Sequence, residues 1–578
     1  MITGFLIKGF KAFGNFETQY LPIKPITLLF GQNAAGKSSI LQALAWANEI
    51  HHTGNIDVHR MKLTGQHANL GGYNSFHYRK NALELEKNQS EESTDFGWSF
   101  DFANSIKSLG KVPVSKNSGS LGDRPYDFEI QYEIITRGVS GNPSIWRVII
   151  SWGSLQFEFI NDMTGKFHLE IPMVVGVGKG SIRLDSDEGS EWFLSERYGT
   201  TPDQEMTQDF QEGINEIQEN LANRKPLTLV GLLPRLSPLK VSNKNSIAAQ
   251  ELFSDLQKLV IEMGNSVDCF LENISYLGPW RGIPNLAELS MTTQSEGHPE
   301  LKHWANLLGD DDARDEVNEW LDRLGCRIEI STVNIVEKDK ILNLVEEVWV
   351  DAVNEGNDDD FIELLAEKLE EAMPSNSKIL TFRTPGGGIP ITPESTGVGV
   401  SQLIPVIAAA LTGKGGTLLI EQPELHLHPK LQAEIGDLLI AAAVASNGPR
   451  HCFIVETHSE HLILRLLRRV RETADSMSLS IYLDHPLTPN HLSIVHVGRP
   501  EAQSELYSKI DPNEPDKQKD YRQYQRDSQM VSSLPTLITC LPVNANGDFD
   551  VEWPGGFFAD RMQEIFSASE LKQWYENS

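Results

Sequence analysis

Residues 31–39 read GQNAAGKSS, which fits the phosphate-binding pattern GxxxxGK[ST]. Gly31 and Gly36 allow the backbone to curl so that successive N–H groups face phosphate oxygens. Lys37 can reach the β- and γ-phosphates, and the Ser38 hydroxyl can ligate Mg²⁺. The run therefore predicts a site for ATP and Mg²⁺. The nucleotide-binding residues predicted here are Gly31, Asn33, Gly36, Lys37, Ser38 and Ser39.

A second run, LLIEQPELHLHP at residues 418–429, could supply the acid chemistry of an ATP hydrolase. Its apolar part predicts a buried strand that delivers Glu421 to the magnesium ion, beside Ser38. Gln422 follows at the position where many ATPases keep a glutamate that activates water, and an amide cannot act as a general base. Glu424 is a nearby carboxylate that could take this task. The residues leave open whether turnover is fast, slow or nearly absent.

Two further runs carry groups that could contact phosphate. STGVGVSQLIPVI, residues 395–407, is a Gly/Ser loop that leads into an apolar helix. One nucleotide rarely needs two such cradles, so we expect Gly399, Ser401 and Gln402 to serve the nucleotide held by another copy of the chain. The alternative is a plain glycine-rich turn before a core helix. In FIVETHSEH, His458 follows an apolar strand and could hydrogen-bond a γ-phosphate.

The helix after His458 carries the densest basic cluster of the chain. A solvated helix face is one interpretation, and contact with nucleic acid or a partner is the other. The residues concerned are Arg465, Arg468, Arg469 and Arg471.

Composition limits the classes of partner and the compartment. The 578 residues have a formal net charge of −30, so bare phosphate backbone would be repelled except at a local basic patch. The four cysteines occur singly, which predicts neither a zinc knuckle nor a disulfide framework. No apolar run approaches the roughly 20 residues that span a bilayer, and the first residues do not resemble a signal peptide. We therefore expect a soluble, cytoplasmic protein without membrane contact.

The predicted secondary-structure elements that position these groups change in type along the chain. An apolar strand precedes the glycine-rich run at residue 31, and a helix of apolar periodicity follows it. Alternating aromatic segments then predict antiparallel strands, helical spacing follows, and an α/β pattern returns near residue 379. The predicted division is 1–95, the N-terminal ATPase lobe; 96–200, an antiparallel β extension; 201–378, a mainly helical insertion; 379–480, the C-terminal ATPase lobe; and 481–578, a C-terminal domain.

In this order, the four motifs resemble the ABC-type ATPase heads of the group that contains structural-maintenance-of-chromosomes proteins and OLD-family ATPases. GVGVSQLIPVI, IEQPELHLHP and VETHSEHLILRLLRR look like the stand-alone bacterial AAA ATPases of the OLD-like branch. YLGPWRGIP resembles a segment of that branch, and DFDVEWPGGFF is similar to a C-terminal domain of unknown function often appended to it. The resemblance implies an α/β fold, namely an ABC-type P-loop head split by a β-rich and then a helical insertion, with a small C-terminal domain.

The resemblance also implies roles. Residues 399–402 would form the signature that acts across a dimer, Glu421 would be the Walker B carboxylate, and His458 would be the switch histidine. No Toprim-like carboxylate set follows His458, so no nuclease activity of the chain itself is expected. Members of the branch are commonly encoded in anti-phage defence systems beside a separate effector. The expected protein is a dimerising ATPase that regulates such an effector, for example a nuclease. The alternatives are an ATP-bound scaffold with little turnover and a DNA-repair or chromosome-maintenance ATPase that clamps DNA.

Overall fold

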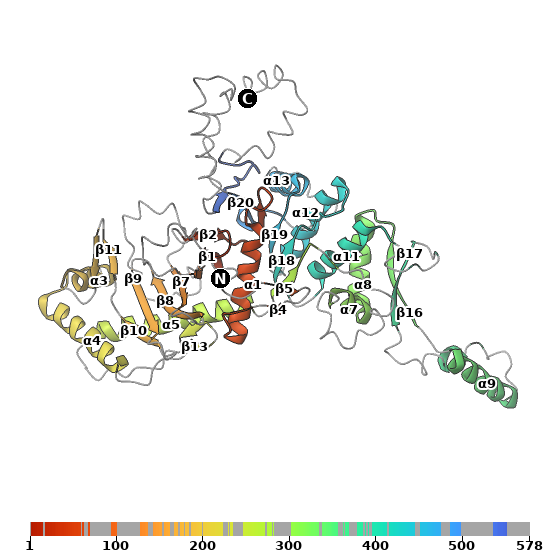
Figure 1. The fold of residues 1–578 in the computed structure, drawn as a ribbon, viewed down its shortest axis with the longest axis horizontal. Helices are drawn as coiled ribbons and strands as arrows, with labels where there is room; N and C mark the ends of the chain where they lie inside the picture. The colour runs from red at the N-terminus through yellow and green to blue at the C-terminus, as the bar shows by residue number, and fades with distance from the viewer. Residues whose placement is uncertain are drawn as a thin grey trace, which may run out of the picture.

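The structure is a computed structural model, and it describes two large β-sheets with helices between and beside them, together with four two-stranded pairs (Figure 1). The described residues are 2–14, 18–58, 60–62, 67–69, 94–100, 128–136, 143–152, 155–161, 167–170, 174–177, 180–183, 187–198, 200–222, 229–230, 232–234, 247–271, 274–279, 281, 302–334, 338–355, 362, 365–368, 378–384, 388, 391, 396–412, 415–444, 451–474, 486–498 and 536–551.

The first sheet is parallel except at one edge, and it carries the glycine-rich run. Its three central strands are almost entirely buried and apolar, as expected for a sheet covered on both faces. β21 is antiparallel to β20, and every other neighbouring pair is parallel. The strand order is β15 (Ile274–Leu277), β18 (Gly416–Glu421), β19 (His451–Glu456), β3 (Ile26–Phe30), β20 (Leu492–Gly498) and β21 (Leu537–Leu541).

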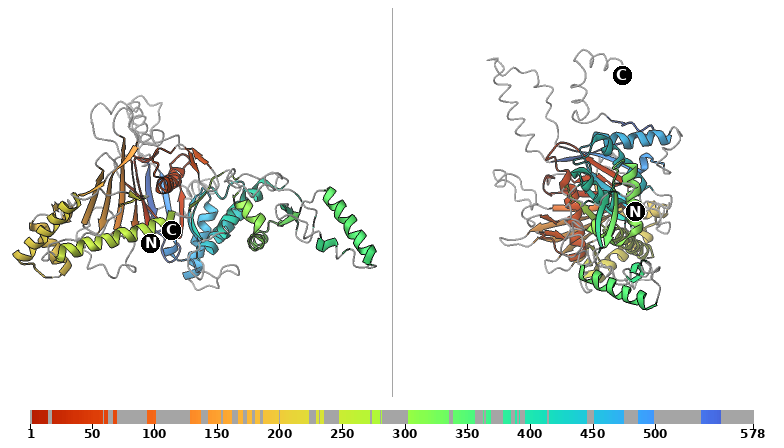
Figure 2. Two further views of the ribbon diagram at one scale, coloured as in Figure 1. Left: turned by 90° about the horizontal axis from the view of Figure 1, so that it is seen from below. Right: turned by 90° about the vertical axis from the view of Figure 1, so that its right-hand side faces the viewer.

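The second sheet is antiparallel and lies beside the first (Figures 1 and 2). Alternation of apolar and polar residues lets one face of each strand join the core. Its order is β10 (Phe167–Glu170), β9 (Leu155–Asn161), β8 (Pro143–Trp152), β7 (Phe128–Thr136), β6 (Thr94–Phe100), β1 (Ile2–Lys8) and β2 (Gln19–Pro22). Short hairpins pair β11 (Val174–Val177) with β12 (Gly180–Arg183), β13 (Leu229–Val230) with β14 (Leu233–Pro234), and β4 (Arg60–Lys62) with β5 (His67–Asn69).

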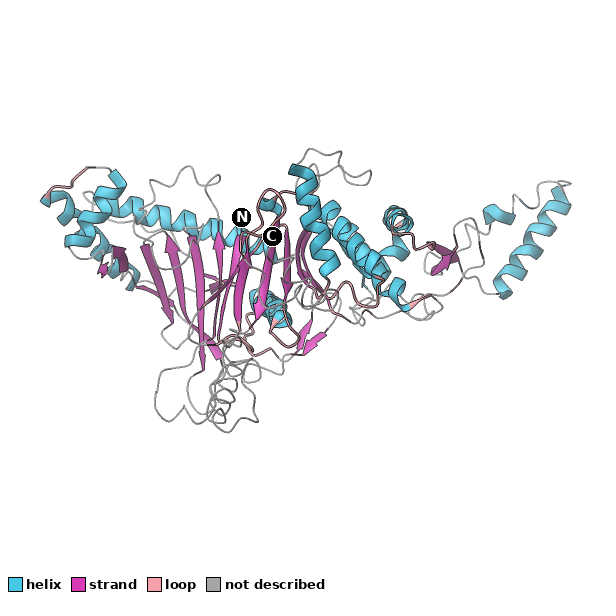
Figure 3. Cartoon of the chain, turned by 90° about the horizontal axis from the view of Figure 1, so that it is seen from above, coloured by secondary structure: helices cyan, strands magenta, loops and turns pink. Residues whose placement is uncertain are grey.

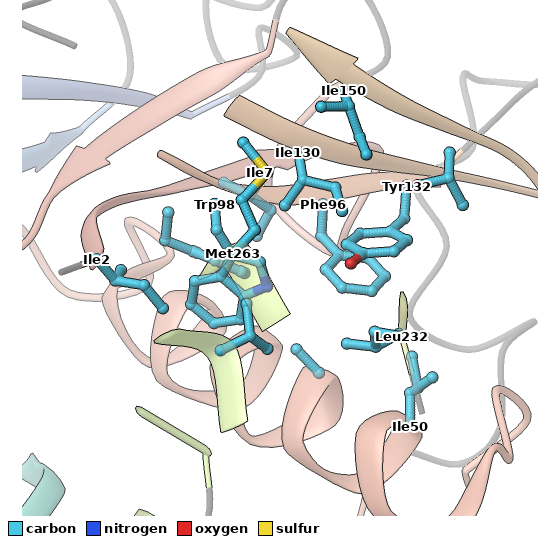
Figure 4. Packing of buried hydrophobic residues seen from close by; sticks show 14 of the residues in the cluster. Ile2, Ile7, Ile50, Phe96, Trp98, Ile130, Tyr132, Ile150, Leu232 and Met263 are labelled. Carbon is cyan, nitrogen blue, oxygen red and sulfur yellow. The ribbon is translucent and has the colours of Figure 1, made fainter. Parts of the chain in front are cut away.

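One hydrophobic core joins the two sheets through α1 (Lys37–Thr53) and α5 (Ile247–Leu271). α5 contacts both β1 and β18. Figure 4 shows part of this core, where Trp98 and Tyr132 of the antiparallel sheet face Met263 of α5 and Ile50 of α1. The helices α3 (Asp187–Tyr198) and α4 (Gln204–Ala222) pack at the outer end of the same core.

A second core covers the other face of the parallel sheet. It is built by α7 (Lys302–Gly309), α8 (Asp311–Arg323), α11 (Val398–Leu411), α12 (Pro429–Ala443), α13 (Glu460–Ala474) and the antiparallel pair β16 (Glu329–Asn334) and β17 (Lys378–Arg383). α9 (Lys338–Glu355) projects away from this lobe (Figure 3). A short 3₁₀ helix, Pro489–His491, precedes β20.

The architecture is mixed α/β, and the head around the parallel sheet draws on distant parts of the chain. α5 and β15 fall within 201–378, the range expected to be a helical insertion, yet they pack against the head itself. Residues 481–578 are described at 486–498 and 536–551, where they supply β20 and β21 of the parallel sheet. Among the described helices, none is long and apolar enough to cross a membrane.

Candidate nucleotide-hydrolysis site

The glycine-rich loop lies between the end of β3 and the start of α1, as the motif requires. Gly31 has φ +146° and Gly36 has φ +105°, a region that favours glycine. A Cβ on Gly31 would lie 2.0 Å from the carbonyl oxygen of Val497, so no larger residue fits. Gln32, Asn33 and Ala34 form the exposed crest of the loop. This backbone cradle suits phosphate oxygens.

Lys37 begins α1 and turns back under the loop. Its side chain is buried, and Nζ donates hydrogen bonds to the carbonyl oxygens of Gly31 at 3.1 Å and Gln32 at 2.8 Å. Burial lowers the pKa of Lys37, while the nearby carboxylates of Glu456 and Glu424 act in the opposite direction. The ammonium therefore lies where triphosphate oxygens could replace two carbonyl partners.

The carboxylate that meets the loop hydroxyl belongs to Glu456. Ser38 Oγ donates a hydrogen bond of 2.6 Å to Glu456 Oε2, because β19 is the direct neighbour of β3 in the sheet. Burial raises the pKa of Glu456, and the bond from Ser38 opposes that shift. Glu456 stands in the run FIVETHSEH, in which the sequence assigned a role to His458 alone. A hydroxyl beside one carboxylate fits Mg²⁺, which takes few protein ligands and completes its shell with phosphates and water.

Glu421 lies one strand further from the loop, in register with Glu456. It is 7% exposed, and Tyr276 of β15 donates a close hydrogen bond from its hydroxyl to Glu421 Oε1. Burial raises the pKa of Glu421 to about 7, with the Tyr276 bond opposing. Among the described residues, no group of three or more His, Cys, Asp and Glu side chains is arranged to hold a metal ion. Any magnesium here would therefore depend on the nucleotide phosphates as well.

The turn after β18 brings two further predicted residues together. Gln422 has φ +45°, a left-handed conformation that is uncommon for a residue with a side chain. Glu424 is buried, and its Oε1 accepts a 2.6 Å hydrogen bond from the backbone N–H of His458. Burial raises the pKa of Glu424 and lowers that of His458, which the charge of Lys37 lowers further. Glu424 and His458 therefore meet at the same end of the sheet.

The hydroxyl of the signature serine does not face outward, as a contact with a second copy would require. Ser401 is fully buried, and its Oγ lies 2.6 Å from Thr396 Oγ1, so its hydroxyl faces the protein interior. Gln402 is also buried. The outward end of α11 is formed by its N-cap, Gly397, and by Val398, which is 54% exposed.

Two residues that sequence reasoning did not assign also lie at the site. The guanidinium of Arg281 is buried and donates to the carbonyl oxygens of Glu421 and Gln422. Lys11 lies in the turn between β1 and β2, where its charge lowers the pKa of Glu421. Arg281 stands in YLGPWRGIP, and the family resemblance of that segment was the signal in the sequence that could have pointed to this residue.

The arginines of α13 are used in ion pairs. Arg465 and Arg469 both bind Asp437 of α12, at 2.5 and 2.7 Å. Arg468 pairs with Glu472, and Arg471 pairs with Asp548. The basic cluster therefore joins α13 to its neighbours, and it does not present four unpaired cations.

The loop, the carboxylates at the ends of β18 and β19, and the separate glycine-initiated helix α11 define an ATP-binding, ABC-type P-loop ATPase. Comparisons of the sequence agree with this class. Residues 6–259 match the family model described as "AAA domain". Residues 309–465 match the model described as "AAA domain, putative AbiEii toxin, Type IV TA system". No curated protein matches the chain.

The solved structures that the chain matches include heads of SMC proteins. One is an Smc head bound to the C-terminal winged-helix domain of ScpA, with 12% identity and a TM-score of 0.31, covering 86% of this chain and 94% of that one. Another is a Pyrococcus furiosus head with an extended coiled coil bound to the C-terminal domain of ScpA (12%, 0.32, 86% and 93%). A third is the SMC head from Thermotoga maritima (11%, 0.25, 80% and 91%).

Proposed function

We propose that the protein binds ATP with Mg²⁺, hydrolyses it slowly, and dimerises around the nucleotide. The observation that carries this proposal is the contact between Ser38 of the P-loop and Glu456, with Glu421 and Glu424 at the neighbouring strand end. Magnesium, when bound, would neutralise charge on the phosphates, and Ser38, Glu456 and Glu421 are the residues proposed to hold it. Lys37 would then bind the β- and γ-phosphates.

Glu424 is the carboxylate proposed to accept a proton from the attacking water. The oxygen of that water would bond to the γ-phosphorus as the bond to the β–γ bridging oxygen breaks, releasing ADP and phosphate. The burial that raises the pKa of Glu424 makes it a stronger base than an exposed carboxylate. His458, whose backbone N–H donates to Glu424, is proposed to contact the γ-phosphate as a switch histidine.

The main competing proposal is a scaffold that holds ATP with little turnover. Gln422 favours it, because an amide stands directly after the Walker B carboxylate. Phosphate release separates the two proposals when the wild type is compared with Glu424→Gln, Glu456→Gln and Gln422→Glu. We expect Glu424→Gln to bind ATP normally and to lose about 100-fold or more in kcat. Lys37→Ala should not bind ATP, and the exposed helix variant Glu347→Gln should match the wild type. If the wild type and every variant that binds ATP release no phosphate, the scaffold proposal is supported.

Dimerisation is proposed to place the exposed end of α11 from one copy against the nucleotide of the other. The switch would need a contact that distinguishes ATP from ADP, and a γ-phosphate at that end provides one. Because Ser401 is buried, the backbone around Gly399, and not the serine hydroxyl, is proposed to make this contact.

The biological role is proposed to be regulation of a separately encoded effector, for example a nuclease, in anti-phage defence. This proposal rests on the family resemblance of the motifs. Phage should form fewer plaques on cells that carry the gene with its neighbouring reading frames, and Lys37→Ala should abolish that protection. Equal plaque numbers with and without the intact genes would contradict the role but not the ATPase.

A further inference from the structure

Arg281 is joined to the signature helix by two hydrogen bonds from its backbone. Its N–H donates to Gln402 Oε1 at 3.0 Å, and its carbonyl oxygen accepts from Gln402 Nε2 at 2.6 Å. Both residues are about 95% buried. This two-point contact ties the segment after β15 to α11, so the two must move together or break both bonds.

The side chain of Arg281 reaches the other part of the site. Nη2 donates to the carbonyl oxygen of Glu421 at 2.7 Å and to that of Gln422 at 3.3 Å. Gln422 has φ +45°, and its own N–H donates to the carbonyl oxygen of Glu456 at 2.8 Å. The guanidinium therefore helps to hold the first residue after β18 in an uncommon conformation.

The hydrogen-bonding capacity in this interior is incompletely used. Nε and Nη1 of Arg281 and Oε2 of Glu424 are buried, and within the described part of the chain none of them has a hydrogen-bond partner. The charge of Glu424 is the largest attraction acting on Arg281. Buried unpaired donors and acceptors are costly, so a shift of the turn that paired them would be favourable.

We propose that Arg281 is a positioning residue that transmits the position of α11 to the turn at residues 421–424, and so sets the rate of ATP hydrolysis. This inference rests on the proposed function. A second copy that engages the outward end of α11 would act on Gln402, then on Arg281, and then on the carbonyls beside Glu421. Each nucleotide site would thereby respond to occupation of the other.

The test compares Arg281→Met and Gln402→Met, two unbranched replacements that remove hydrogen bonds from the proposed path. We expect each to lower kcat about 10- to 100-fold, the range seen when a group that orients a ligand-bearing residue is removed. ATP affinity, measured with a fluorescent analogue, should change less than about threefold, and Arg281→Lys should recover part of the rate because an ammonium can still donate to the carbonyls. Arg147→Met and Gln131→Met, in the antiparallel sheet, are the matched controls.

The double variant decides whether the two residues act on one path. If they do, the double variant Arg281→Met with Gln402→Met should have about the same kcat as the more impaired of the two single variants. If the residues act independently, the two fold-losses in kcat should multiply. Multiplied losses would overturn the proposal, as would loss of ATP binding in parallel with kcat in Arg281→Lys. If the wild type binds ATP without hydrolysing it, this inference fails and nucleotide binding stands. If the wild type does not bind ATP, the proposed function fails as well.

Discussion

Burial and the neighbouring carboxylate of Glu456 make ionisation of Glu421 costly. Its pKa is about 7 in the folded protein, mainly through burial, against an ordinary value of 4.5. The folded state therefore holds this proton more tightly than the unfolded chain. The contribution of Glu421 to the free energy of unfolding falls as pH rises from about 4.5 to 7. Above pH 7 the whole of this destabilisation is present.

Glu421→Gln should remove this cost while keeping an oxygen that accepts the hydrogen bond of Tyr276. We expect the nucleotide-free variant to be more stable than the wild type by about 1–3 kcal/mol at pH 8, with the difference falling to about a quarter of that value at pH 5. Urea unfolding at both pH values measures it, with the exposed Glu347→Gln as control. An equal difference at the two pH values would show that ionisation is not its cause.

The motif predicted the P-loop residues because their chemistry and backbone conformation are local. The partner of Ser38 could not be predicted in this way, since it depends on the order of strands in the sheet. β19 follows β18 in sequence but lies between β18 and β3, and this order brings Glu456 to Ser38. The burial of Ser401 likewise depends on the elements that surround α11, since every residue of this helix from Ser401 to Leu411 is buried.

At the scale of elements, the residue that precedes β21 is hydrogen-bonded to the nucleotide loop, although the two lie far apart in the sequence. Thr536, directly before β21, is 1% exposed, and its Oγ1 donates a 2.8 Å hydrogen bond to the carbonyl oxygen of Ala35 in the loop. Its backbone N–H donates to the carbonyl oxygen of Ala12 at 2.9 Å. A Cβ on Gly36 would also approach the Thr536 side chain.

Thr536→Val keeps the shape of the side chain but leaves the Ala35 carbonyl without this donor. We expect a loss of about 1–3 kcal/mol in folding stability and weaker ATP binding, because the loop loses a fixed point. Isothermal titration with a non-hydrolysable ATP analogue measures the affinity. Thr539→Val, at an exposed position of the same strand, should change neither quantity. Unchanged affinity in Thr536→Val would separate β21 from the site.

The contact between α12 and α13 depends on one buried acid. Asp437 accepts hydrogen bonds from Arg465 and from two nitrogens of Arg469, and Arg469 is 8% exposed. Asp437→Asn should destabilise the protein by about 3 kcal/mol or more, because it leaves a buried guanidinium without its main counter-charge. Arg468→Met, at an exposed pair, should cost less than about 1 kcal/mol. Thermal unfolding compares the two, and equal losses would contradict this use of the arginine cluster.

At the scale of the molecule, one hydrophobic core links the antiparallel sheet to the parallel sheet, and a second links the parallel sheet to the signature helix. The nucleotide loop and the signature helix thus lie in one connected body. The net charge of −30 opposes the approach of two copies. Any dimer that forms around ATP must overcome this repulsion, so we expect moderate salt to strengthen it.

Val398 offers the sharpest test of that dimer, because it is exposed at the first position of α11. An aspartate at a helix start is favourable for the helix itself, so Val398→Asp should fold normally. Its carboxylate would meet the γ-phosphate of the nucleotide bound to a second copy, and the two negative charges would repel. In a Glu424→Gln background that retains ATP, sedimentation velocity should show a dimer that Val398→Asp lacks, with ATP binding by the monomer unchanged. Val350→Asp, at an equally exposed position on α9, should still dimerise. An ATP-dependent dimer of undiminished affinity in Val398→Asp would show that the copies meet through a different surface.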